Sequence, residues 1–104
     1  MEKMMINPDY AKPILALANL CSSEKIPHTI NPIHDGLQIR FPWNNGDIVC
    51  HYFSYGHEYG DVESMGCPWD WDGDDVTRLT VEDAIMKLVS WYREYKIENC
   101  IMNF

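Results

Sequence analysis

Two short turn signals, Asp35-Gly36 and Asn45-Gly46, divide the middle of the chain into short β-prone segments. Asp-Gly and Asn-Gly pairs favour tight hairpin turns, because glycine adopts positive φ without steric cost. Strands joined by such short connections pair antiparallel with their neighbours in the chain, since a parallel connection needs a dozen or more residues. The sequence therefore predicts an antiparallel meander.

The three segments around these turns have the composition of β-strands. Residues 26–33 contain two prolines and three isoleucines, which is typical of an edge strand because proline donates no backbone N–H. Residues 37–41 alternate apolar and polar side chains, so we expect one buried face. Residues 48–55 are apolar or aromatic on both faces, which predicts the central strand.

Two further segments have helical character. Residues 9–23 carry apolar side chains around most of the circumference, which predicts a helix largely buried against the sheet, with Pro13 in its first turn. A second helix is expected to begin at Thr80, whose hydroxyl can cap the first turn, with Asp83 three residues on as in a capping box. Its predicted buried stripe consists of Val81, Ile85, Leu88, Tyr92 and Tyr95. Trp91 lies off this stripe and is expected to pack under the C-terminal tail or to contact a partner.

A short fourth strand is expected over residues 61–65, and residues 66–79 are predicted to form a loop because they lack periodicity. The sequence thus predicts a two-layer α+β fold in the order helix, three or four antiparallel strands, helix, with both helices on one sheet face. The 104 residues are 46% hydrophobic, enough for one core, so we expect a single domain over residues 1–104. Ile101 and Phe104 are expected to dock on this domain.

The chain shows no targeting signal. Its first residues lack the apolar stretch of a secretory signal, and no run of about 18 apolar residues could span a membrane. We therefore expect a cytoplasmic protein. Because that compartment keeps thiols reduced, we interpret the four scattered cysteines as small buried hydrophobic residues: Cys21, Cys50, Cys67 and Cys100.

Negative charge is concentrated in one part of the chain. The net charge is -8, from 16 acids and 8 bases. Between Glu58 and Asp83 nine acids accompany one base, Arg78, whereas seven acids and seven bases cancel elsewhere. Nucleic acids and anionic membranes would repel such a chain, so we expect no direct contact with either and a basic protein as the partner.

Two tryptophans alternate with the acids of this window. In an extended segment, Asp70, Asp72 and Asp74 would share one side at a spacing of about 6.6 Å, with the tryptophans pointing the other way. Such a row could bind the Lys and Arg side chains of a phosphate-binding groove. Alternatively, the tryptophans pin a loop to the sheet and the aspartates only solvate it. The predicted partner-binding residues are Glu58, Tyr59, Asp61, Glu63, Trp69, Asp70, Trp71, Asp72, Asp74 and Asp75.

Metal-binding and catalytic motifs fail at diagnostic positions. Asp70-x-Asp72-x-Asp74 begins like a calcium loop, but Asp75 replaces the glycine and Val81 the final glutamate. The histidines and cysteines lack zinc-site spacing, and the sequence has no nucleophile motif or phosphate loop. We therefore expect no cofactor and no enzymatic activity; a divalent-metal-binding or structural accessory protein is the alternative.

The run Cys67-Pro68-Trp69-Asp70-Trp71-Asp72-Gly73-Asp74-Asp75, within the segment from Tyr59 to Val76, resembles small accessory proteins of phages and prophages. This resemblance implies an inhibitor of the anti-CRISPR type that imitates nucleic acid, acting in the cytoplasm of a host cell. Immunity proteins that neutralise nuclease toxins are similar in size and acidity. We therefore expect a non-enzymatic inhibitor that blocks the basic surface of a nucleic-acid-binding nuclease or effector. Self-association into a homodimer is a further alternative.

Overall fold

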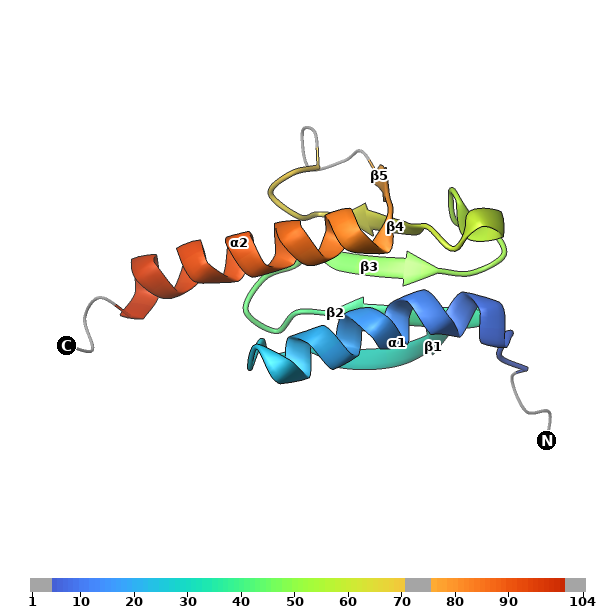
Figure 1. The fold of residues 1–104 in the computed structure, drawn as a ribbon, viewed down its shortest axis with the longest axis horizontal. Helices are drawn as coiled ribbons and strands as arrows, with labels where there is room; N and C mark the ends of the chain where they lie inside the picture. Colours follow the sequence, from blue (N-terminus) through green and yellow to red (C-terminus); the bar gives the residue numbers. More distant parts are fainter. Residues whose placement is uncertain (1–4, 71–75, 101–104) are drawn as a thin grey trace.

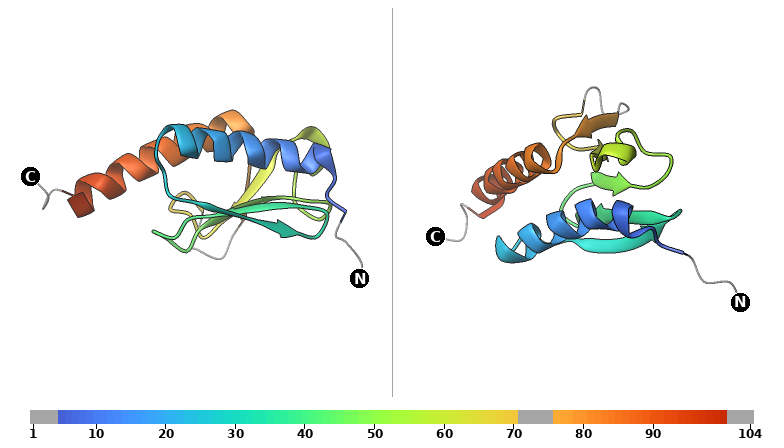
Figure 2. Two further views of the ribbon diagram at one scale, coloured as in Figure 1. Left: turned by 90° about the horizontal axis from the view of Figure 1, so that it is seen from below. Right: turned by 45° about the vertical axis from the view of Figure 1, so that its right-hand side comes forward.

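A computed structural model describes residues 5–70 and 76–100, with two helices and a five-stranded antiparallel sheet (Figure 1). The elements in chain order are α1 (Pro8–Ser23), β1 (Thr29–Ile33), β2 (Gly36–Arg40), β3 (Asp47–Cys50), the 3-10 helix η1 (His57–Tyr59), β4 (Val62–Met65), β5 (Val76–Leu79) and α2 (Val81–Cys100). The order in the sheet is β1-β2-β3-β4-β5, so the predicted meander is confirmed. Both helices lie on the same face of the sheet (Figure 2), which confirms the α+β class with five strands instead of three or four.

Helix α1 packs with one face only. Asn7 caps it by accepting the Asp9 N–H at 2.9 Å, and Pro8 occupies the first turn, where its missing N–H costs nothing. Pro13 therefore lies in the second turn, beyond the position expected for it. The buried residues are Ala11, Pro13, Ile14, Leu17, Ala18 and Cys21. The prediction of a largely buried helix is wrong, because α1 is the outer layer of a two-layer fold and Leu15 faces solvent.

Helix α2 begins where the sequence predicts. The Thr80 hydroxyl oxygen accepts the Asp83 N–H at 3.2 Å, which confirms the cap. The side chains buried deepest on this helix are Ala84, Leu88 and Trp91. The expected stripe is therefore displaced: Tyr92 and Tyr95 are only partly buried. Trp91 is a core residue, because its ring packs against those of Trp43 and Phe41, with centroids 4.3 and 5.7 Å away.

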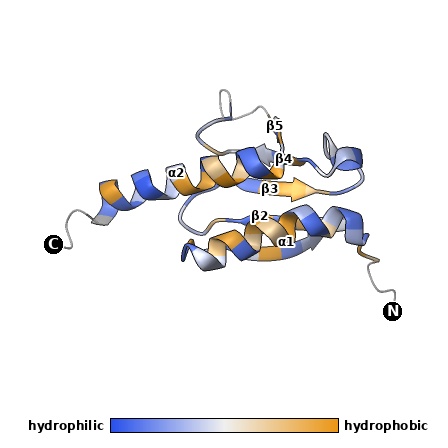
Figure 3. Ribbon diagram, in the orientation of Figure 1, coloured by the Kyte–Doolittle hydropathy of each residue, from blue (hydrophilic) through white to orange (hydrophobic). Residues whose placement is uncertain are grey.

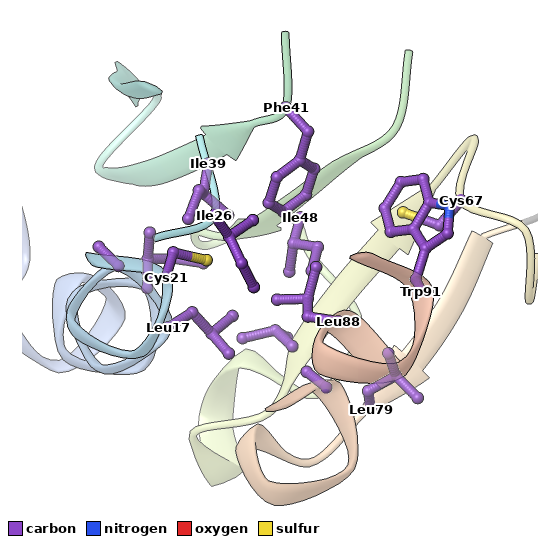
Figure 4. Packing of buried hydrophobic residues seen from close by; sticks show 14 of the residues in the cluster. Leu17, Cys21, Ile26, Ile39, Phe41, Ile48, Cys67, Leu79, Leu88 and Trp91 are labelled. Atoms are coloured by element: carbon purple, nitrogen blue, oxygen red, sulfur yellow. The ribbon is translucent and has the colours of Figure 1, made fainter. Parts of the chain in front are cut away.

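The core lies between the helices and the sheet (Figure 4). Ile39 and Ile48 from the central strands are fully buried against Leu17 of α1 and Leu88 of α2. On each helix hydrophobic residues alternate with hydrophilic ones, and β3 is largely hydrophobic (Figure 3). Burial of these side chains supplies the main stabilisation of the fold.

Three cysteines contribute to this core. Cys21, Cys50 and Cys67 are buried free thiols, which confirms the interpretation of these three; the side chain of Cys100 is outside the described part. Burial raises the pKa of the Cys21 and Cys50 thiols to about 11. Both are therefore protonated at neutral pH and are poor nucleophiles.

Two strand predictions need correction and two are confirmed. β1 is an edge strand and β4 forms as expected. The predicted loop over 66–79 instead ends in strand β5, where Leu79 pairs with Val62. Four residues are too few to show a periodicity in the sequence. The segment is a strand because it pairs with β4. The predicted central strand over 48–55 is central but ends at Cys50.

The turns form at positions slightly different from the sequence signals. The β1–β2 turn is at His34 and Asp35, with a φ of 51° at His34, and Gly36 is the first residue of β2. Gly36 is required for another reason: an added Cβ would overlap the carbonyl oxygen of Cys50 in β3. Glycine thus allows the two strands to approach closely where the β3–β4 connection begins.

We predict that Gly36→Ala lowers the free energy of unfolding by about 3 kcal/mol, because the methyl group would force β2 away from β3. Gly60→Ala is the matched control: its φ is 76°, but its added Cβ meets nothing within 4 Å. That strain alone should cost about 1 kcal/mol. Urea denaturation of both variants measures the difference, and equal losses would contradict the close approach.

Candidate functional site

The six predicted partner-binding residues that the structure describes lie in different environments. Glu58 and Tyr59 are exposed in η1. Asp61 forms an ion pair with Arg78, with 2.7 Å between the carboxylate oxygen and Nε. Glu63 lies on β4 and is half-buried. Four of the predicted residues lie outside the described part of the chain: Trp71, Asp72, Asp74 and Asp75.

Trp69 and Asp70 belong to a buried polar network. The Trp69 indole N–H donates to the Ser64 hydroxyl oxygen at 2.8 Å, and Ser64 donates to one Asp70 carboxylate oxygen at 2.7 Å. The other carboxylate oxygen accepts the Cys67 N–H at 2.8 Å and closes the turn between them. Asp70 is therefore buried, and the expectation that it lies in an exposed row of aspartates is wrong, because β4 and the turn supply its donors.

This network favours the alternative interpretation for Trp69. Its ring packs edge-on against Trp91, with centroids 5.2 Å apart, so it attaches the chain after β4 to α2. Asp70 is buried and both of its carboxylate oxygens accept hydrogen bonds within the protein, so the first position of the calcium-like pattern serves to hold a turn. Among residues 5–70 and 76–100, no group of three or more His, Cys, Asp and Glu side chains could hold a metal ion.

The largest departure from the sequence prediction is after Cys50, where the chain leaves the sheet. Local hydrogen bonds replace a strand ladder. The His51 N–H donates to the Ser54 hydroxyl oxygen at 3.0 Å, and the Ser54 N–H donates to the His51 carbonyl at 3.0 Å. The Phe53 N–H donates to Nδ1 of His51, also at 3.0 Å. These bonds close a tight turn.

Two carboxylates from distant parts of the chain complete this turn. Asp35, in the β1–β2 turn, accepts the Tyr52 N–H at 2.9 Å. Glu63, on β4, accepts the Tyr55 N–H at 3.1 Å. Each of the five N–H groups from 51 to 55 thus has an acceptor, and the segment has no need of a neighbouring strand.

We call residues 51–60 the aromatic loop, because it displays aromatic side chains to solvent. The exposed fractions are 59% for Tyr52, 70% for Phe53, 63% for Tyr55 and 75% for Tyr59. Large exposed apolar groups that gather in one place typically mark an interaction surface. Sequence reasoning missed three of these four residues, because the β propensity of the run placed them in the central strand.

The aromatic loop is fixed at one end of the sheet, beside the N-terminus of α1 (Figure 1). The His57 ring packs against Tyr10 of α1 and Tyr52, with centroids 5.3 and 5.4 Å away. The Asn7 N–H donates to the Asp35 carbonyl at 2.8 Å, which joins the start of α1 to the β1–β2 turn. The loop is therefore supported by three parts of the fold.

The side chain of Arg78, which belongs to β5, packs against this loop. The Arg78 guanidinium lies over the Tyr59 ring, 5.2 Å from its centroid, while its Nε donates to Asp61. An aromatic face and a carboxylate both attract a guanidinium, the first through cation–π attraction and the second through a charge-assisted hydrogen bond. The local chemistry therefore suits arginine side chains.

Comparison with protein-family models finds no matching family, and comparisons with curated proteins and with solved structures find no match. Within the described ranges, no helix has the length and apolar character needed to cross a membrane.

We predict that Asp70→Ala lowers the free energy of unfolding by about 2 kcal/mol, because it leaves the Ser64 hydroxyl and the Cys67 N–H without their acceptor. Thermal or urea denaturation measures the loss. The control is Glu58→Ala, which removes an exposed carboxylate and should change stability by less than about 0.5 kcal/mol. Similar stability of both variants would argue that Asp70 is exposed.

Proposed function

We propose that this protein is a non-enzymatic inhibitor that binds a basic, nucleic-acid-binding protein through its aromatic loop and blocks the basic surface. The observation that carries the proposal is the exposure of four aromatic side chains within eight residues, each more than half accessible. Tyrosine and phenylalanine are enriched at protein interfaces, because they bury a large area with few rotatable bonds.

The loop also offers these rings on a fixed backbone. The five hydrogen bonds from residues 51–55 hold the segment in one conformation before any partner arrives. A preorganised surface loses less conformational entropy on binding than a flexible one, so more of the contact energy remains as affinity. This favours a binding role over a purely structural role for the rings.

Charge favours a basic partner. The whole chain carries a net charge of -8, and Glu58 is exposed in the aromatic loop next to Tyr59. The contact of Arg78 with Tyr59 and Asp61 shows which side chain suits such neighbours. Proteins that bind nucleic acids present arginine and lysine clusters to phosphates, so their grooves have the complementary chemistry. An acidic protein with aromatic anchors can occupy such a groove in place of the nucleic acid.

We predict that the double variant Phe53→Ser, Tyr59→Ser binds its partner at least about 30-fold more weakly, which corresponds to about 2 kcal/mol, the loss of one aromatic anchor at the centre of an interface. The protein is immobilised and used to capture partners from a lysate of its source cells, with bound proteins identified by mass spectrometry. The captured protein should be a nucleic-acid-binding protein, and added duplex DNA should displace it.

The matched control removes equally exposed apolar side chains from another face. Met86 is 70% exposed, like Phe53, and Ile97 is also exposed; both lie on α2. Met86→Ser, Ile97→Ser should capture the same protein as the wild type, and capture should weaken with added salt. The proposal fails if the loop variant captures as well as the control, or if DNA does not compete.

A further inference from the structure

His51 occupies the junction between the sheet and the aromatic loop. Its side chain follows the last residue of β3 and is only 8% exposed. Its ring lies edge-on to that of His34 in the β1–β2 turn, with the two ring centroids 4.7 Å apart. The ring centroid of Phe53 lies 6.2 Å from that of His51. Phe53 and His34 also contact each other, at 5.2 Å. Three rings from two connections thus pack together, and Phe53 is both a member of this cluster and one of the exposed aromatic side chains.

The hydrogen bonds of His51 determine its protonation state. Its Nδ1 accepts the backbone N–H of Phe53 at 3.0 Å, so this nitrogen must carry a lone pair and no proton. The neutral ring then carries its proton on Nε2. An imidazolium has a proton on both nitrogens, and its Nδ1–H would point at the Phe53 N–H. Two donors cannot share this position, so protonation breaks the bond.

We infer that neutral His51 is the positioning residue of the aromatic loop, and that protonation of its Nδ1 releases Phe53 from the binding conformation. The inference rests on the proposed function only for its effect on binding; its effect on loop conformation stands by itself. It assigns a pH dependence to the surface: the loop is ordered for binding at neutral pH and is released in acid.

Charged neighbours on every side act on this ring. Burial and the neighbouring His34 and His57 lower the pKa of His51 below its ordinary value of 6.5, and they outweigh the carboxylates of Glu63 and Asp35, which raise it. A histidine with a lowered pKa binds a proton less readily when folded than when unfolded. The stability that it contributes is therefore fully present above about pH 6.5 and is lost as the pH falls through the lowered value.

The first test follows the loop by nuclear magnetic resonance, without any partner. In the wild type at pH 7.5, the ring nitrogen shifts of His51 should show the Nε2–H tautomer, and the Phe53 amide shift should change in one step as the pH falls from 7.5 to 5. In His51→Asn the side-chain oxygen can take the place of Nδ1 as acceptor but does not titrate in this range. Its Phe53 amide should therefore stay unchanged.

Three outcomes would overturn the inference. The first is an Nδ1–H tautomer in the wild type, which needs no variant to detect. The second is a wild-type Phe53 amide that does not respond to pH. The third is a His51→Asn protein whose Phe53 amide titrates as in the wild type, since His34 or His57 would then be responsible. The matched control is His34→Asn, which removes a neighbouring imidazole but keeps the His51 hydrogen bond, so the pH-dependent step of the Phe53 amide should remain.

The second test measures capture of the partner at pH 7.5 and 5.5. Wild-type capture should weaken at the lower pH by the same factor by which the population of neutral His51 falls in the resonance titration. His51→Asn should change about twofold or less. Equal weakening of both proteins would overturn the role of His51 in binding. Failure of both to capture at either pH would instead overturn the proposed function, and the resonance data would still decide the loop.

Discussion

Five consecutive backbone N–H groups that follow β3 donate to acceptors that are mostly side-chain atoms, and the conformation of the aromatic loop depends on these hydrogen bonds. Ser54, His51, Asp35 and Glu63 provide four of the five acceptors, and the His51 carbonyl provides the fifth. A backbone donor removed from water without an acceptor costs about 1–3 kcal/mol. Because these five N–H groups find acceptors outside a strand ladder, the chain can leave the sheet after β3. Aromatic side chains with high β propensity then face solvent.

Much of the fold could be predicted from local rules. The Thr80 cap and the edge position of β1 with its proline depend on a few neighbouring residues, and both are found in the structure. The end of β3 could not be predicted, because residues 51–55 have strong β propensity and two of their acceptors, Asp35 and Glu63, come from elsewhere in the chain. Strand β5 was not predicted for a related reason, because it depends on its pairing with β4.

The candidate site was predicted only in part. Counting charges located an acidic region, but it could not separate carboxylates that face solvent from those that hold the protein together. Asp70 closes a buried turn, Asp61 pairs with Arg78, and Glu63 binds the aromatic loop. These acids stabilise the surface on which Tyr59 and Glu58 are exposed. The charge pattern therefore assigned a binding task to Asp70, although this side chain is buried and closes a turn.

The account depends on an aromatic loop that is fixed while its side chains remain exposed. Amide hydrogen exchange measured residue by residue tests this directly, because it reports on backbone hydrogen bonds and not on side-chain exposure. The account predicts slow exchange at the amides of residues 51–55 at neutral pH, comparable with that of β3. Exchange at the rate of an unstructured peptide would show that the loop is not held by these acceptors, and would contradict the proposal of a preformed binding surface.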